Sequence, residues 1–208
     1  MNKILFLTLA AVAPGLASAA VILDFNTNLS NQPPVNGNQL LARLTITNAG
    51  ADTVDMSFEH FANPDTSRFI GGLWLNVDPY KNVSLVGTPT APISSVSSAM
   101  DGITAPGGQY LWDLFVAFEQ APPGDRMFQG RTVNFSLTGT NLLETDFLAL
   151  AGKTQGHNDD LYGLIHIQGV ENTPGIDSSW YGAVPEPCSM IALGAGLATL
   201  AARRRRKA

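Results

Sequence analysis

Alternating apolar and polar positions recur along the middle of the chain with the two-residue period of β-strands. The clearest case is residues 132–138, where three apolar side chains alternate with hydroxyl and amide side chains. Residues 42–47 and 54–59 alternate in the same way, and the Asn48-Ala49-Gly50-Ala51-Asp52 segment between them has the composition of a turn. Each segment is therefore expected to be a strand with one wet face, and the last two are expected to pair antiparallel.

Further strands are predicted from shorter apolar runs between turn signals. Residues 110–119 are apolar on both faces, interrupted only by Asp113, which favours a central strand covered on both sides. Residues 142–150 are compatible with one or two helical turns, capped by Thr140 or Asn141. The other expected strands are residues 21–25, 69–77, 83–86 and 162–168.

This pattern predicts an all-β fold. Short strands joined by Gly- and Pro-rich connections favour an antiparallel β-sandwich of jelly-roll type, with a closed barrel as the alternative. Residues 20–183 have the length of one domain, and residues 182–184 are expected to link it to the C-terminal segment. The single cysteine, Cys188, cannot form an internal disulfide, so burial and hydrogen bonds must stabilise the domain.

The first 19 residues have the three regions of a secretory signal peptide. Lys3 precedes an uncharged apolar run over residues 4–13, and small residues follow. Ala17 and Ala19 fit the cleavage site, with cleavage expected after Ala19 and Ala20 as the alternative. The Sec translocon and signal peptidase are the expected partners of this segment.

The C-terminal end has the layout of a short membrane anchor. Residues 190–202 carry no charge and would cover about 20 Å as a helix, which is short for a hydrocarbon layer of ~30 Å. The basic cluster that follows would remain on the cytoplasmic side and leave the body of the protein outside. Its members are Arg203, Arg204, Arg205, Arg206 and Lys207.

Together these features resemble a known sorting signal. The motif Pro185-Glu186-Pro187, a single short transmembrane helix and a terminal Arg cluster resemble the PEP-CTERM signal of Gram-negative bacteria over residues 184–208. The resemblance implies recognition and cleavage by an exosortase in the inner membrane. It also implies an exported protein that reaches the cell surface or the extracellular space and is associated with exopolysaccharide.

Without its two ends the chain is strongly acidic. The full sequence has a net charge of −5, whereas residues 20–185 hold six cationic and 16 acidic side chains, a net of −10. Nucleic-acid binding needs clustered Lys and Arg to neutralise phosphates, so no nucleic-acid partner is expected.

The sequence nominates no catalytic constellation. The three histidines form no zinc-binding or metalloprotease spacing, and no nucleophile motif is present. His60 falls on an apolar strand face and is expected to be a hydrogen-bonded core histidine rather than a ligand. We therefore expect a protein that is not an enzyme and has no cofactor.

Two weaker binding candidates remain. Asn158, Asp159 and Asp160 offer hard oxygen ligands for Ca²⁺, although turn formation explains them equally well. Tyr162, His166 and Gln168 are expected to share one face of the last strand, where they could contact a sugar or simply decorate the sheet edge. The sequence thus favours a non-catalytic surface or matrix protein, with a lectin-like or carbohydrate-active module as the alternative.

Overall fold

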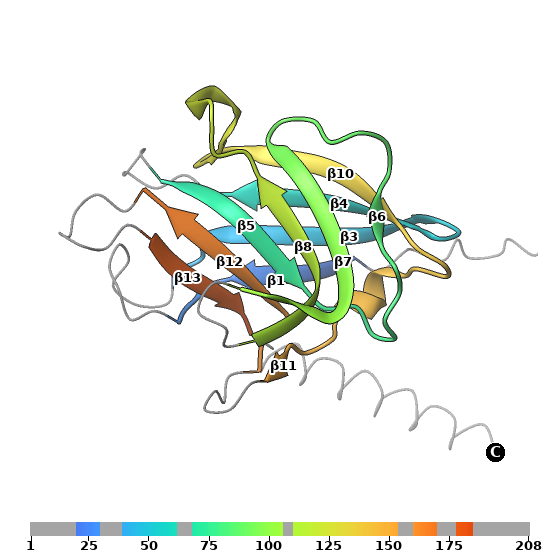
Figure 1. Ribbon diagram of the computed structural model, residues 1–208. Helices are drawn as coiled ribbons and strands as arrows, with labels where there is room; N and C mark the ends of the chain where they lie inside the picture. Colours follow the sequence, from blue (N-terminus) through green and yellow to red (C-terminus); the bar gives the residue numbers. More distant parts are fainter. Residues whose placement is uncertain are drawn as a thin grey trace, which may run out of the picture.

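The computed structural model describes residues 20–29, 39–61, 68–105, 110–153, 160–169 and 178–184. Within these ranges the protein is a sandwich of two antiparallel sheets, which confirms the predicted all-β sandwich. Figure 1 shows the second sheet lying in front of the first. The predicted short transmembrane helix lies outside the described residues, and among those that are described no helix is long and apolar enough to span a membrane.

The first sheet has the strand order β1-β3-β4-β10-β6. Its β3 and β4 form the predicted hairpin around Ala51 and Asp52, and the predicted strand 132–138 is β10. The strands are β1 (Val21–Phe25), β3 (Ala42–Gly50), β4 (Thr53–His60), β10 (Thr132–Thr138) and β6 (Ser84–Leu85).

The second sheet has the order β11-β8-β5-β12-β13-β2, with β7 paired to β8 and β9 paired to β5. The predicted central strand is β8, which pairs with both β5 and β7. The strands are β2 (Thr27–Asn28), β5 (Phe69–Leu75), β7 (Ile93–Thr104), β8 (Tyr110–Phe118), β9 (Met127–Phe128), β11 (Gly152–Lys153), β12 (Gly163–Gln168) and β13 (Ser178–Ala183).

Helical structure in the described ranges is limited to two short 3₁₀ turns. They are η1 (Pro123–Asp125) and η2 (Glu144–Phe147). The predicted turn within residues 142–150 is therefore present, but its N-cap is Leu143 rather than Thr140 or Asn141. Asn141 instead takes a left-handed backbone with φ of 53°.

Two sequence expectations about the end of the domain are wrong. The strand at 163–168 is not the last one, because β13 follows it and pairs with it along its whole length. Gly182 and Ala183 belong to β13 and are not a linker. Tyr181 and Ala183 lie in the core, so the domain extends to the end of β13.

The main hydrophobic core lies between the two sheets. It takes the inward-facing side chains of both, including Phe25 and Phe58 of the first sheet and Leu73 and Ile165 of the second. A smaller apolar cluster includes Trp74 and Leu164. These two residues alternate with the core residues of β5 and β12, so they lie on the outer face of the second sheet.

Candidate functional site

Several of the sequence-predicted site residues lie outside the described ranges. These are Ala17 and Ala19 of the signal peptide, the whole Pro185-Glu186-Pro187 motif, the basic cluster 203–207, and Asn158 and Asp159 of the calcium candidate. Asp160 is described and exposed. In the part of the chain that the structure describes, no group of three or more His, Cys, Asp or Glu side chains is placed to hold a metal ion.

The predicted Tyr162, His166 and Gln168 stripe is only partly present. Tyr162 precedes β12 at a bend and packs against the main core. His166 and Gln168 do share the outer face of β12 with Leu164. Since β12 pairs with β5 on one side and β13 on the other, this face is in the middle of the sheet and not at its edge.

His166 belongs instead to an aromatic row that crosses four strands. Its ring stacks on Trp180 of β13, its cross-strand partner, with ring centroids 4.1 Å apart and planes at 13°. Trp180 lies 5.4 Å from Trp74 of β5, and Trp74 stacks at 4.5 Å on Phe115 of β8. We call Phe115, Trp74, Trp180 and His166 the aromatic row.

Two consecutive glycines in β5 make room for this row. The pairing of β5 with β12 shifts register here, since His166 pairs with Gly72 and Ile167 with Ile70, which leaves Gly71 as the extra residue. A Cβ on Gly72 would lie 2.6 Å from the rings of Phe115 and Trp74. A Cβ on Gly71 would lie 2.9 Å from Gln120 Nε2 and 3.0 Å from Gln168 Oε1. The rings and amides therefore lie directly on the sheet backbone.

The residues of the aromatic row differ in how much of their surface is exposed. Trp74 is buried at 4% exposure, because its neighbours cover it, whereas Phe115, Trp180 and His166 are half-buried. Burial lowers the pKa of His166 to about 4, so its ring is neutral at pH 7. Neither ring nitrogen has a hydrogen-bond partner among the described residues, which leaves an uncharged donor and acceptor on this face.

A cation lies near Gln168, on the same face of the sheet as the aromatic row. The Arg126 guanidinium is 4.4 Å from the ring centroid of Phe69, the cross-strand partner of Gln168. Arg126 Nε donates to Gln120 O at 2.6 Å. Within the described ranges Arg126 has no carboxylate partner, whereas Arg43 pairs with Asp24 and Lys81 with Asp146.

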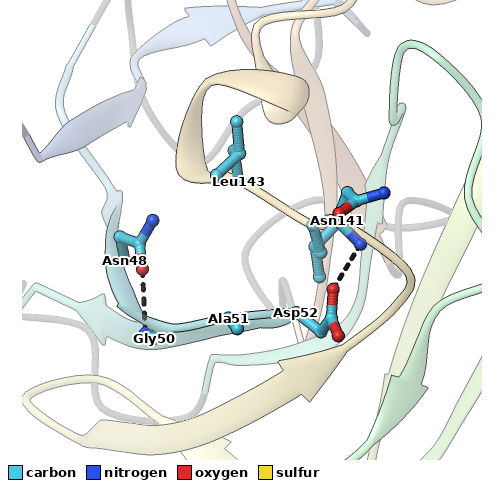
Figure 2. A pocket seen from close by; sticks show the side chains of 7 residues that line it. Asn48, Gly50, Ala51, Asp52, Asn141 and Leu143 are labelled. Atoms are coloured by element: carbon cyan, nitrogen blue, oxygen red, sulfur yellow. Dashed lines mark hydrogen bonds between the residues drawn. The ribbon is translucent and has the colours of Figure 1, made fainter.

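A hollow of about 330 Å³ lies beside the β3–β4 hairpin (Figure 2). Its polar groups bond the local backbone: Asn48 Oδ1 accepts from Gly50 N at 2.8 Å, and Asp52 Oδ1 accepts from Asn141 N. Asp52 and Asn141 both have positive φ, and Thr138 Oγ1 donates to Asp52 O at 2.9 Å. This cluster fixes two turns against each other.

A second hollow, of about 360 Å³, lies where β5 ends. Asp113 interrupts the apolar run of β8 here, and its carboxylate accepts from Val77 N at 3.1 Å and from Asp101 N at 2.7 Å. Asn76 Oδ1 accepts from Asp113 N, and Asn76 Nδ2 donates to Leu150 O at 2.8 Å. The polar side-chain atoms of Asn76 and Asp113 are thus all hydrogen-bonded to backbone groups.

His60 is a core histidine, as predicted. It is 1% exposed, and its Nδ1 lies 3.1 Å from Met127 O. Burial lowers its pKa to about 4. A neutral imidazole bonded to a carbonyl in the core has a structural role.

Sequence reasoning did not find Trp180 or Arg126 as site residues. Residues 178–183 contain a Trp-Tyr pair, and since both residues are enriched in strands, this composition could have predicted the strand. Which residue faces His166, however, depends on the pairing of β12 with β13, and Arg126 is placed over Phe69 by the short β5–β9 pairing.

Comparison with known proteins identifies the C-terminal segment. The family model for the PEP-CTERM protein-sorting motif matches residues 183–206. No curated protein and no solved structure matches the chain significantly. The motif marks the chain as an exported protein that is sorted by an exosortase and associated with the membrane or cell surface.

Proposed function

We propose that this chain is a non-catalytic exported protein that becomes part of the extracellular matrix and associates with exopolysaccharide after its C-terminus is processed. The observation that carries the proposal is the sorting motif at residues 183–206, attached directly to a sandwich. The polar clusters of the described residues support it, since Asp52, Asn76 and Asp113 are committed to backbone hydrogen bonds.

Sorting is tested by mass spectrometry of the C-terminus in a Gram-negative host that carries an exosortase. Changing Pro185-Glu186-Pro187 to alanines, or deleting Arg203 to Lys207, is expected to leave uncleaved protein in the inner membrane. An intact C-terminus in the wild-type protein would overturn the processing step, and the same trimmed mass in the wild type and both variants would overturn its dependence on the motif.

Matrix association is tested by fractionating cells and extracted exopolysaccharide. The wild-type protein is expected to co-purify with the polymer and to be lost to the medium in a polymer-deficient strain. Equal distribution in the two strains would refute the association.

The second candidate function is carbohydrate binding by a lectin-like or carbohydrate-active module. The aromatic row is the specific observation that favours the binding version. Glycosidase chemistry requires two carboxyl groups about 5 to 10 Å apart across a cleft. Asp113 lines a hollow with Asp78 and Asp101, but both its oxygens accept backbone N–H groups, which argues for a structural role.

A further inference from the structure

We infer that the outer face of the second sheet binds an acidic polysaccharide, with a sugar ring on the aromatic row and a carboxylate on Arg126. This inference rests on the proposed association with exopolysaccharide and names the surface and the polymer class.

The rings supply a platform for a pyranose. Trp180 and Phe115 are half-buried, and together with His166 they line the sheet surface on three strands, β13, β8 and β12. Aromatic rings combine a large apolar face with little side-chain entropy to lose, which suits the CH-rich face of a sugar. Gly72 has no Cβ, and this lets the platform lie close to the backbone.

Polar groups adjoin the platform. His166 is neutral at pH 7 and its ring nitrogens have no hydrogen-bond partner among the described residues. Gln120 is exposed, and its amide lies over Gly71 beside that of Gln168. Sugar hydroxyls both donate and accept, so imidazole and amide groups at the border of an apolar platform match them.

Charge selects an acidic polymer. The exported body has a net charge of −10 and should repel polyanions except where a cation is available. Arg126 is such a cation, because its Nε donates to a carbonyl while the described residues provide no carboxylate for the guanidinium. Stacking on Phe69 orients this guanidinium, and a guanidinium binds a carboxylate through two parallel hydrogen bonds.

The spacing suits a polymer. Gln168 and His166 are two residues apart on β12, a distance of about 7 Å along a strand. Phe69, on which Arg126 stacks, pairs with Gln168 and so lies on the same face of the sheet as His166. A uronate chain that runs along β12 can therefore engage both the aromatic row and Arg126.

The experiment measures binding of the purified full chain to polygalacturonate and to neutral dextran, by affinity gel electrophoresis at low salt. Intrinsic fluorescence gives a second readout, because Trp112 is fully buried and Trp74 nearly so, while Trp180 is half-buried. Binding to polygalacturonate is expected to shift Trp180 emission and to weaken as salt is added.

Arg126→Gln is expected to weaken polygalacturonate binding by about tenfold or more, the loss of one charge-assisted contact. Trp180→Ala should abolish binding, and Trp180→Phe, which keeps a ring for His166, should retain part of it. Arg43→Gln is the matched charge control, since Arg43 is on the first sheet and already paired with Asp24. It should bind as the wild type does.

Three results would overturn the inference. They are no binding to polygalacturonate at low salt, equal binding by the Arg126→Gln and Arg43→Gln variants, and dextran binding as tight as polygalacturonate binding. Failure of the matrix association in cells, with polymer binding intact in vitro, would refute the proposed function and leave the site standing. The reverse result would refute the site alone.

Discussion

At the scale of single residues, the buried polar side chains act on the backbone. Asp113 is 7% exposed in a strand that is otherwise apolar. It is retained there because two backbone N–H groups, from Val77 and Asp101, have no strand partner and need a buried acceptor. One carboxylate therefore connects the end of β5, the irregular middle of β7 and the central strand β8.

Asp113→Ala is expected to lower the free energy of unfolding by about 2 kcal/mol, because it leaves the buried N–H of Val77 and the part-buried N–H of Asp101 without their acceptor. Asp113→Asn keeps one acceptor oxygen and should cost less. Urea unfolding followed by circular dichroism measures both. Asp55→Ala, at an exposed position that bonds only Ser136 in the first sheet, is the control and should change stability by less than about 1 kcal/mol.

His60 predicts how stability depends on pH. Its pKa is about 4 in the folded protein and 6.5 as a reference, so the unfolded state binds a proton first as pH falls. Stability is full above pH 6.5 and is lost between pH 6.5 and 4, by roughly 3 kcal/mol in total for this group.

Denaturant melts between pH 7 and 4.5 check this prediction. His60→Gln should flatten the decline, and His166→Gln should flatten it less, because the His166 ring is partly solvated. A wild-type profile that is flat over this window would contradict it.

At the scale of elements, the alternation of apolar and polar residues predicts the strands that have one buried and one solvated face. It gives no signal for strands of other kinds. Residues 132–138 and the β3–β4 hairpin show the two-residue period because each has a buried and a solvated face. The long β7 was not predicted, since it is Ser-rich and mostly exposed and thus carries no apolar period. It forms a strand because its backbone pairs with that of β8, so the cause is a tertiary contact and not the local sequence.

The candidate site was predictable to the same limited extent. His166 and Gln168 were found because they lie on one strand. The remaining members come from three other strands and a turn, and their proximity depends on register and on the bulge at Gly71. Local sequence does not encode that register, so Trp180 and Arg126 were missed.

Gly72, next to the bulge at Gly71, gives a further prediction. Gly72→Ala would place a Cβ 2.6 Å from the rings of Phe115 and Trp74, both of which are packed. We expect a loss of about 1–3 kcal/mol in stability and a changed near-ultraviolet circular dichroism spectrum, since the stack must shift. Gly124→Ala is the matched control, because a Cβ there meets no atom within 4 Å. Equal spectra for the two variants would contradict the packing argument.

At the scale of the whole molecule, the sorting signal begins where the folded domain ends. The motif begins at residue 183, which is also the last residue of β13. Tyr181 and Ala183 belong to the core between the sheets, and Tyr162 N donates to Ala183 O at 2.8 Å. Val184 packs against the outer apolar cluster. Processing that leaves the sandwich folded must therefore cut after Val184.

Truncation tests this boundary. A chain ending after Val184 is expected to melt at the same temperature as the full chain, because it keeps every described contact. A chain ending at residue 177 loses β13, which uncovers one side of β12 and removes Tyr181 from the core. Burial of one such side chain contributes about 2 kcal/mol, and six backbone pairings are lost as well, so this chain should not fold cooperatively. Thermal melting by circular dichroism distinguishes the two chains. Mass spectrometry of the exported protein should likewise find a C-terminus at or beyond residue 184, and a mature end within β13 would show that processing removes part of the folded domain.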